Sequence, residues 1–579
     1  MSGVAFHTRP ARSGEATLRL EGAEVAVWAH SPVDPRREAR AQLERLGCRA
    51  GDLVVAVGGG LGWLTLAARE VGAVPVLLLE PPESPAGLAL EPDLPVTRGD
   101  ANALRAVVTR EQQRRGWPDL LVVHNPAYGR VFPAWAARLL EVLPPGRQVS
   151  RVRQAGGVEE RRWPPRTVLL PDAGYFLTRE LDEAFRALGL RTMRVPLRAR
   201  ERDLRPGSRP GTDADADYVD RLLGAVLEGK PDLAVAVNHL GLDRDGRVQE
   251  LLAGLRVPLA VWYVDSPEFI LDDAPCLETE RSVLFCWERA WLPRLREKAR
   301  GPLVHLPLAG SRAFLREPRP RRDLSLVAGS NTGALRKWRG KLDCPPALRP
   351  ELDDLLDQAV SFARDALPGD ELVRRMARGA WPGLAAWLDA SRRRALESLL
   401  VLRATRDERL ALARALQDED FVLHGDEGWR GELPERLLRP PLDYYRGLAE
   451  HYRGTRVSLN TTSRQMPGTV NQRLFDAPLA GSAMLTDRVG DLEELFEPGA
   501  EVAVQRSPEE AREEARRLLG DEPARRRLVE RARARILAEH LYMHRVTTML
   551  ERIGAAREEG PAAPQPRPRA EEREACASW

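Results

Sequence analysis

The feature that most constrains the fold is a pattern repeated three times along the 579 residues. A short run of aliphatic residues is followed by a turn that contains Gly and then by an amphipathic helix. The first set covers about residues 15–150, the second runs from Thr167 to about residue 312, and the third runs from Asp323 to about residue 555. Strands that alternate with helices form parallel sheets covered by helices. The sequence therefore predicts an α/β protein built from three modules.

Two segments interrupt the pattern, and the chain ends in a third unusual stretch. Residues 197–217 are rich in Arg, Gly, Pro and Asp and predict a loop. Residues 347–417 carry apolar residues at three- and four-residue spacing only, which predicts a helical insertion in the third module. Its simplest role is packing. The tail 558–579 is rich in Pro, Ala, Arg and Glu, so we expect disorder there.

Composition excludes several classes of protein. No run of eighteen apolar residues exists, so we expect no membrane span, and the first residues do not resemble a secretory signal. The formal net charge is +3, with acidic and basic residues interspersed, which gives nucleic-acid binding no support. The five Cys form no CxxC pair, so a zinc ribbon or a disulfide framework is not expected. These features predict a cytoplasmic protein.

The first module, expected within residues 1–155, contains a Gly-rich turn after a buried strand, Asp52–Val57. A second strand, Val74–Leu79, ends in Glu80. Gly lets the backbone approach a ligand, a helix N-terminus favours an anion, and an acid after the second strand can accept ribose hydroxyls. The alternative is a turn that only allows close packing of helix and strand. The candidate nucleotide-binding residues are Gly58, Gly60, Gly62 and Glu80.

A third strand of this module, residues 118–124, is followed by Asn125–Tyr128. This loop resembles the N-P-P-Y loop of S-adenosylmethionine-dependent amino-methyltransferases, with Ala127 in place of the second Pro. Another resemblance covers residues 31–38 (SPVDPRRE), the Gly-rich turn and residues 124–128 (HNPAY). These look like the motility accessory factor family, which implies a Rossmann-like core.

The second module, expected at residues 165–312, has polar residues directly after two predicted strands. Residues 231–237 lead to Asn238 and His239, and residues 258–264 lead to Asp265. Open α/β sheets bind ligands at the carboxyl ends of their strands. Asp265 and His239 are therefore candidates for a catalytic base. The alternatives are a turn residue before Pro267 and a structural hydrogen bond, respectively.

The third module, expected at residues 323–555, contains two candidate anion sites. One is the turn at residues 329–333, which follows a strand. The other is a helix predicted at residues 470–479, whose N-terminus favours an anion and whose Arg473 can add a bidentate phosphate contact. The candidate donor-binding residues of this module are Gly329, Ser330, Asn331, Lys337, Arg464, Gly468, Thr469, Arg473 and Asp476.

The second and third modules together resemble a known family. Residues 457–502, the helical stretch 509–519 and residues 538–545 resemble the C-terminal half of the CgeB-like (spore maturation protein-like) glycosyltransferases, which belong to the GT-B group. Residues 261–267 (VWYVDSP) match their W-x-x-D-x-P signature, and residues 326–333 (LVAGSNTG) match the start of their second half. The resemblance implies two facing Rossmann-like domains that bind a nucleotide-sugar between them, with the donor mainly on the C-terminal half.

In related retaining enzymes, an E-x7-E motif places a carboxylate on the donor ribose. The equivalent pair here is Gly468 and Asp476, so the first acid is absent. The resemblance still implies that Asp476 binds the ribose. Such a site needs no obligatory metal or other cofactor, because helix N-termini and cationic side chains stabilise the leaving diphosphate.

One further motif concerns metal binding. Asp213, Asp215 and Asp217 form a D-x-D-x-D run, and D-x-D binds a metal in the GT-A fold, where it follows a strand. Here the run precedes a predicted helix at residues 218–227, where acids suit the helix N-terminus. We therefore expect no metal site.

Three functions remain open. The first is a glycosyltransferase that moves a sugar from a nucleotide-sugar to a protein or to a surface-polysaccharide precursor. The second is an S-adenosylmethionine-dependent methyltransferase that uses the N-terminal module. The third is a non-catalytic scaffold that binds sugar nucleotides, as the loss of the first acid at Gly468 would allow. The sequence does not identify the sugar, the acceptor, the stereochemical outcome or the oligomeric state.

Overall fold

The computed structural model describes residues 4–22, 25–90, 96–99, 101–154, 159–174, 177–197, 216–242, 246–271, 282–299, 301–362 and 367–558. Almost all of the predicted loop 197–217, the D-x-D run and the predicted disordered tail lie outside these residues. The chain divides into two compact units. Unit 1 contains residues 1–161 together with 215–230 and 247–257, and unit 2 contains the remaining residues.

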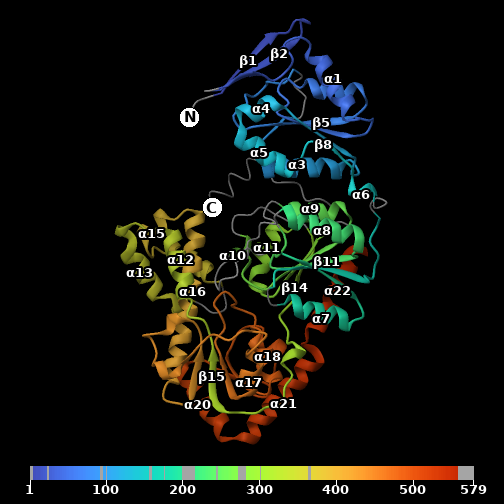
Figure 1. Ribbon diagram of the computed structural model, residues 1–579. Coiled ribbons are helices and arrows are strands. Elements are labelled where there is room, and N and C mark those ends of the chain that lie inside the picture. The colour runs from blue at the N-terminus through green and yellow to red at the C-terminus, as the bar shows by residue number, and fades with distance from the viewer. Residues whose placement is uncertain are drawn as a thin grey trace. The chain divides into compact units, whose positions relative to one another are not determined.

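Unit 1 begins with a small antiparallel sheet, which precedes the Gly-rich turn in the chain (Figure 1). Its strands are β1 (Ala5–Pro10), β2 (Ala16–Glu21) and β3 (Ala26–Trp28). A five-stranded sheet of order β6-β5-β4-β7-β8 follows. Its strands are β4 (Leu53–Val57), β5 (Val74–Glu80), β6 (Val96–Arg98), β7 (Leu120–His124) and the antiparallel β8 (Gly146–Gln148).

The central strand β4 explains how this sheet is buried. Val54 and Ala56 pack into one buried cluster, whereas Val55 and Val57 pack into another, because successive side chains of a strand point to opposite faces. The helices of this unit are α1 (Pro35–Arg45), α2 (Trp63–Glu70), α3 (Ala101–Arg114), α4 (Pro126–Val131), α5 (Pro133–Val142), α6 (Arg151–Gln154), α8 (Ala216–Gly229) and α9 (Arg247–Gly254).

Unit 2 contains two six-stranded sheets in which every strand pair is parallel. The first has the order β10-β9-β11-β12-β13-β14. Its strands are β9 (Thr167–Asp172), β10 (Arg191–Pro196), β11 (Leu233–Val237), β12 (Leu259–Tyr263), β13 (Ser282–Cys286) and β14 (Leu303–His305). The unit's helices in this part of the chain are α7 (Thr178–Ala187), α10 (Pro267–Leu271) and α11 (Leu292–Lys298).

The second sheet of unit 2 has the order β17-β16-β15-β18-β19-β20. Its strands are β15 (Arg322–Val327), β16 (Phe421–His424), β17 (Leu438–Arg439), β18 (Thr455–Asn460), β19 (Ala483–Asp487) and β20 (Ala503–Gln505). Leu326, Leu423 and Leu459 stand in register on neighbouring strands and are buried in one core. The carboxyl ends of β15, β16, β18 and β19 therefore lie side by side.

Between β15 and β16 the chain is helical, as the sequence predicts. The helices are α12 (Thr332–Leu342), α13 (Arg349–Asp357), α14 (Pro368–Ala377), α15 (Pro382–Trp387) and α16 (Ala390–Ala415). Asp389 caps α16 by accepting a hydrogen bond from the backbone N–H of Arg392 at 2.8 Å. Leu352, Leu396 and Leu400 are buried in a separate core inside this block.

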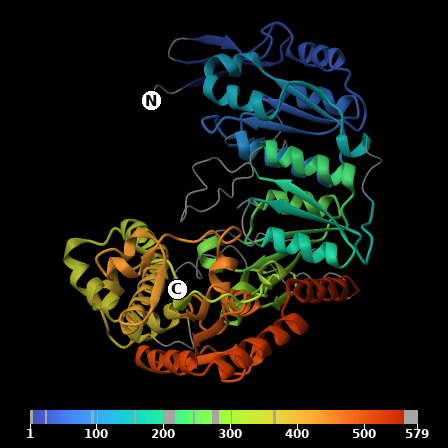
Figure 2. The ribbon, with the colours of Figure 1, turned by 60° about the horizontal axis from the view of Figure 1, so that its bottom comes forward.

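The C-terminal part of unit 2 adds α17 (Leu448–Arg453), α18 (Arg473–Leu479), α19 (Leu492–Leu495), α20 (Pro508–Gly520), α21 (Glu522–Glu539) and α22 (Tyr542–Glu558). Figure 2 shows α22, in red, next to α7, and the two helices are in contact. The α/β fold class with several parallel, Rossmann-like sheets is confirmed. Among the described residues, every helix is too short or too polar to span a membrane.

Candidate functional site

The carboxyl ends of four neighbouring strands in the second sheet of unit 2 carry polar side chains that bond to one another. After β16, Asp426 accepts hydrogen bonds from the backbone N–H of Ser330, at 2.8 Å, and from the Ser330 hydroxyl. After β18, the backbone N–H of Thr462 donates to Asp487 at the end of β19, at 2.9 Å. Loops held in this way form the edge at which open α/β sheets bind ligands.

Two arginines, Arg409 and Arg473, lie at this edge. Arg409 on α16 donates to the carbonyl oxygen of Gly329 at 2.9 Å, and its Nε is buried without a hydrogen bond among the described residues. Burial, followed by the nearby charge of Arg473, lowers the pKa of Arg409 to about 9, although the charges of Glu408, Asp487 and Asp426 act in the opposite direction. Neither guanidinium forms a salt bridge with any acid in the described ranges. A bound anion would relieve this repulsion.

Arg473 is positioned by a short chain of amide side chains. Its backbone N–H donates to Oδ1 of Asn471 at 3.1 Å, and Asn471 in turn donates to Oδ1 of Asn460 at 2.7 Å. The guanidinium of Arg473 also reaches Oδ1 of Asn460, at 3.4 Å. Since Asn460 is the last residue of β18, the sheet fixes the direction of Arg473.

Arg464, which the sequence predicts to hold the diphosphate, forms its hydrogen bonds within the protein in this structure. Its guanidinium donates to both carboxylate oxygens of Glu408, at 3.2 and 2.8 Å, and to the carbonyl oxygens of Phe362 and Val360. Arg464 and Glu408 are both buried. Arg464 therefore joins the loop after β18 to the helical block, and its donors are not free for a ligand.

The helix predicted to begin beside Thr469 begins three residues later than the predicted Val470, at Arg473, and has seven residues. The amides of Gly468 and Thr469 precede it and bind an acid of the protein itself. Both N–H groups donate to Oε2 of Glu288, each at 2.9 Å. These two predicted donor-binding residues therefore contact a carboxylate from the loop after β13.

Asp476, the predicted ribose-binding acid, is 1% exposed. Its Oδ2 accepts a hydrogen bond from the Tyr444 hydroxyl at 3.2 Å, while Oδ1 has no hydrogen-bond partner in the described part of the chain. Burial, followed by the charge of Glu180, raises the pKa of Asp476 well above its usual range. A buried acceptor without a donor is costly, so this oxygen is suited to a hydroxyl donor from a ligand.

Two consecutive tyrosines after β17, Tyr444 and Tyr445, contact the acids Asp476 and Glu180, respectively. The Tyr444 hydroxyl meets Asp476 and accepts a hydrogen bond from the side chain of Gln472. The Tyr445 hydroxyl donates to Glu180 on α7 at 3.0 Å, and the two tyrosine rings are nearly perpendicular. The Tyr444 hydroxyl thus occupies one of the two carboxylate oxygens of Asp476.

In the turn after β15, residues predicted to bind the donor form hydrogen bonds within the protein. The amide of Ser330 is occupied by Asp426, the carbonyl of Gly329 binds Arg409, and the side chain of Asn331 donates to the carbonyl of Leu402 at 3.3 Å. Lys337 is exposed on α12. The turn therefore positions Arg409, but the Ser330 amide predicted to bind the diphosphate already has an acceptor.

The two candidate bases lie after β11 and β12 of the first sheet in unit 2. Asp265 accepts a hydrogen bond from the side chain of Asn238 at 2.7 Å, and Asn238 also accepts from the backbone N–H of Asp265 at 3.2 Å. His239 is 3% exposed and stacks on Tyr263 with ring centroids 5.8 Å apart. The partly buried Asp265 is held in one orientation, whereas His239 is part of the core.

The Gly-rich turn of unit 1 has little free capacity for a nucleotide phosphate. The backbone N–H of Gly58 donates to Leu79, that of Gly60 to Glu80 at 2.7 Å, and that of Gly62 to Gly59. Glu80 is 2% exposed and also accepts from Ser84. A Cβ at Gly58 would lie 2.4 Å from Tyr128, so this Gly allows close packing, which is the alternative stated above.

Sequence reasoning missed Arg409, Glu288 and Tyr444. Arg409 lies in a helix full of Arg and Glu, and its distinguishing property, a buried Nε without a hydrogen bond among the described residues, exists only in three dimensions. Glu288 follows β13 by two residues, as Asp265 follows β12, so the rule about strand ends could have found it. Tyr444 lies in a loop without regular pattern.

Comparison with known families matches one part of unit 2. Residues 403–551 match the glycosyl transferase-like family, and this segment contains Arg409, Arg473 and Asp476. No curated protein matches the sequence significantly. In the described ranges, no group of three or more His, Cys, Asp or Glu residues is arranged to hold a metal ion.

Several solved structures are similar over about two thirds of the chain. Sucrose-phosphate synthase from Thermosynechococcus elongatus is 11% identical, with 68% of this chain and 98% of that chain covered and a TM-score of 0.41. T4 phage BGT in complex with its UDP-glucose substrate is 8% identical (67% and 98% covered, TM-score 0.37). A UDP-forming α,α-trehalose-phosphate synthase from Burkholderia vietnamiensis is 11% identical (68% and 99% covered, TM-score 0.35).

Proposed function

We propose that unit 2 is a glycosyltransferase of the GT-B type that takes its sugar from a nucleotide-sugar. The observation that carries this proposal is the pair Arg409 and Arg473, two cations close enough to repel each other at the ligand-binding edge of a parallel sheet, neither of which forms a salt bridge within the described residues. A diphosphate supplies two or more negative charges and accepts bidentate hydrogen bonds from guanidinium groups. The match of residues 403–551 to a glycosyl transferase-like family supports the same assignment.

Asp476 gives this site a second contact. Its unpaired Oδ1 accepts a hydrogen bond from a ribose hydroxyl once Tyr444 has moved aside. The ribose and the diphosphate would then be held by residues of one helix, α18, together with Arg409. The residues proposed to bind the donor are Arg409, Arg473, Asp476 and Tyr444.

The chemical step requires two things of the protein. The bond between the anomeric carbon and the terminal phosphate oxygen breaks, and the electron pair leaves with the nucleoside diphosphate, whose charge Arg409 and Arg473 stabilise. An oxygen of the acceptor forms the new bond to that carbon. In an inverting transfer, the acceptor's proton passes to a base, for which Asp265 is the candidate because Asn238 fixes its orientation. No step requires a metal.

The acceptor we propose is a protein or a surface-polysaccharide precursor, and the reaction would take place in the cytoplasm. This follows from the resemblance to CgeB-like proteins, whose W-x-x-D-x-P signature contains Asp265 in this chain. The methyltransferase alternative has less support, because the amides and the acid of the Gly-rich turn are engaged within the protein.

Calorimetric titration of nucleoside diphosphates (UDP, GDP and ADP) into the full-length protein tests the proposal. One of these diphosphates should bind to the natural protein. Arg409→Met and Arg473→Met should each weaken its binding by about 1.5–3 kcal/mol, the usual contribution of a hydrogen bond to a charged group. Arg414→Met is the matched control, because Arg414 lies on the same helix but pairs with Glu432 at the surface. Equal affinity in all three variants would contradict the proposed site.

A further inference from the structure

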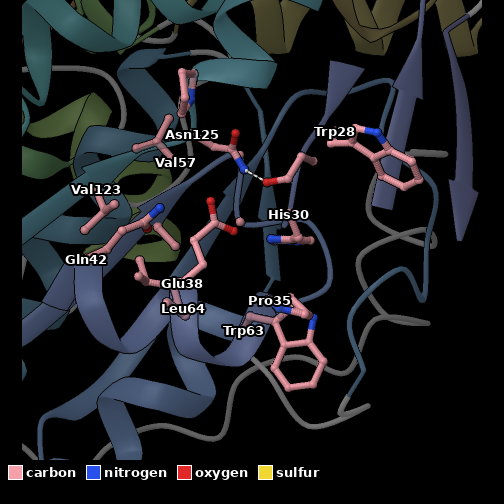
Figure 3. Close-up of a pocket in the computed structure, with 16 residues that line it drawn as sticks. Trp28, His30, Pro35, Glu38, Gln42, Val57, Trp63, Leu64, Val123 and Asn125 are labelled. Atoms are coloured by element: carbon pink, nitrogen blue, oxygen red, sulfur yellow. Dashed lines mark hydrogen bonds between the residues drawn. The ribbon is translucent and has the colours of Figure 1, made fainter. Parts of the chain in front are cut away.

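Unit 1 contains a cavity that the proposed glycosyl transfer does not use (Figure 3). It lies beside the carboxyl ends of β4 and β7, where Val57, Gly58, Val123 and Asn125 line it. From β4 the chain adds β5 and β6 on one side and then crosses to β7 on the other. This change of direction is the point at which open α/β sheets bind ligands.

The cavity is large enough for a small organic molecule. The space open to the centre of a water-sized sphere is about 90 Å³. A single water needs about 10–15 Å³ by this measure, so a molecule of several non-hydrogen atoms fits. Trp28 and Trp63 contribute aromatic surface to the walls, and Leu64 contributes aliphatic surface.

The charge of the lining is negative. Among the described residues that line the cavity, Glu38 on α1 is the only member of the types Asp, Glu, Lys and Arg. Its Oε2 accepts a hydrogen bond from the backbone N–H of Ser31 at 2.7 Å, whereas the structure gives its Oε1 no partner in the described part of the chain. The neighbouring Arg36 and Arg40 both pair with Glu70, so they do not neutralise Glu38.

The other polar groups are fixed around this carboxylate. Figure 3 shows the Glu38 side chain in the middle of the lining, with Gln42 on one side and His30 on the other. The Asn125 side chain donates to the carbonyl of Ala29 at 2.8 Å and accepts from the backbone N–H of Ala127 at 3.0 Å. His30 accepts a hydrogen bond from the backbone N–H of Leu61 at 3.0 Å, which requires a ring nitrogen without a proton.

These observations disfavour an anionic ligand. The turn amides of Gly58, Gly60 and Leu61 already have acceptors within the protein, and the lining holds no cationic side chain. A ligand in this cavity would meet a carboxylate oxygen, an amide from Gln42 and aromatic walls. Carboxylates and the faces of Trp rings both attract ammonium groups.

We propose that this cavity binds a compact organic cation, an ammonium group on a short carbon chain, with Glu38 as its counter-ion and Trp28 and Trp63 as its walls. Gln42 lies one helical turn after Glu38 and donates to a hydroxyl or accepts from the ammonium group. This site is separate from the proposed donor site, and the proposal does not depend on glycosyl transfer.

The test measures the binding of ethanolamine and n-propylammonium to the full-length protein. Saturation-transfer NMR in phosphate buffer at pH 7 detects the bound ligand. Ethylene glycol and propionate are the neutral and anionic comparisons of similar size. Both cations should bind saturably, at concentrations below about 10 mM, whereas the comparison compounds should bind at least tenfold more weakly. A difference of tenfold corresponds to about 1.4 kcal/mol.

Three variants assign the binding to Glu38. Glu38→Gln keeps an oxygen for the Ser31 amide and should reduce cation affinity at least tenfold. Gln42→Glu adds a second carboxylate and should increase it severalfold. Glu44→Gln makes the same charge change at an exposed position of the same helix and should have no effect. The proposal is overturned if the cations do not bind saturably, if propionate binds as well as they do, or if Glu38→Gln and Glu44→Gln behave alike.

Discussion

The carboxylate of Glu288 occupies the position where a side chain on residue 468 would begin. Its Oε2 accepts the backbone N–H of Gly468 at 2.9 Å, and a Cβ built on Gly468 would lie 2.9 Å from its Oε1. The E-x7-E motif of the retaining enzymes that the sequence resembles has an acid at this position, and in this chain the loop after β13 places the carboxylate of Glu288 beside it. Gly468 is therefore required by the close approach of Glu288, and the missing acid does not by itself indicate lost function.

This relationship predicts strong coupling between the two positions. Glu288→Ala should lower the free energy of unfolding by about 2–4 kcal/mol, because the buried amides of Gly468 and Thr469 lose their acceptor. Gly468→Ala should cost about 1–3 kcal/mol through the clash with the carboxylate. In the double variant the clash is gone, so the two effects should fall short of additivity by at least 1 kcal/mol.

Urea unfolding of the four proteins measures this coupling. Additive energies for the Glu288 and Gly468 pair would show that the contact contributes nothing specific.

Arg464 and Glu408 should behave as a structural ion pair. Both side chains are buried, and either one alone leaves an uncompensated charge. Arg464→Met should therefore reduce stability by about 3–5 kcal/mol. The double variant Arg464→Met with Glu408→Met should recover much of that loss, since neither charge of this pair remains. Thermal unfolding followed by circular dichroism compares these two variants with the natural protein, and a double variant as unstable as Arg464→Met would contradict this role.

Asp476 should make stability depend on pH. Its pKa is raised in the folded protein, so the folded state favours the protonated acid. Below the unfolded pKa, about 3.9, both states are protonated and the group has no effect. As the pH rises from there towards the folded pKa, stability is lost, at about 1.4 kcal/mol for each unit of the shift.

Asp476→Asn removes this titration while it keeps an oxygen for the Tyr444 hydroxyl. The stability advantage of the variant over the natural protein should be small near pH 4 and should grow between pH 5 and pH 8. Urea unfolding at these pH values gives the difference directly. A difference that does not change with pH would show that Asp476 is ionised as easily in the folded protein as in the unfolded chain.

The sequence predicted the parts of this molecule that depend on periodic patterns. The aliphatic runs that became β15, β18 and β19 were visible because buried parallel strands are apolar on both faces. The helical insertion was visible for a similar reason. The functions of individual polar residues were not, because they depend on partners distant in sequence. The sequence alone makes Arg464 a candidate phosphate ligand, whereas in the structure it pairs with Glu408, 56 residues earlier.

In the Gly-rich turn of unit 1, the conformation could be predicted from the sequence, but the role of the glycines could not. Gly58, Gly60 and Gly62 have positive φ angles, which only Gly adopts at low cost, so the turn itself was predictable. Its purpose was not, because Tyr128 and His30 fill the space next to Gly58 and Gly60. The nearby cavity depends on Glu38 and Gln42 of α1, whose spacing of four residues is common on any exposed helix.

The last prediction separates binding of the donor from the chemical step. Asp476 contacts the ribose in the proposed complex, so Asp476→Ala should weaken binding of the nucleoside diphosphate by about 1–3 kcal/mol. Asp476→Asn should weaken it less, because one acceptor oxygen remains. Asp265 acts on the acceptor, so Asp265→Asn should lower kcat and leave affinity for the nucleoside diphosphate nearly unchanged. Its hydrogen bond with Asn238 can persist in that variant, which limits structural effects.

Two measurements on the same three variants decide between these roles. Calorimetric titration of the nucleoside diphosphate gives the affinity. Turnover is measured as the nucleoside diphosphate released when the sugar of the nucleotide-sugar is transferred to water or to an added acceptor. Loss of affinity in Asp265→Asn would place that residue at the donor instead. Unchanged affinity in Asp476→Ala, with the protein folded by circular dichroism, would remove Asp476 from the site, and the donor would then depend on Arg409 and Arg473 without a contact to the ribose from α18.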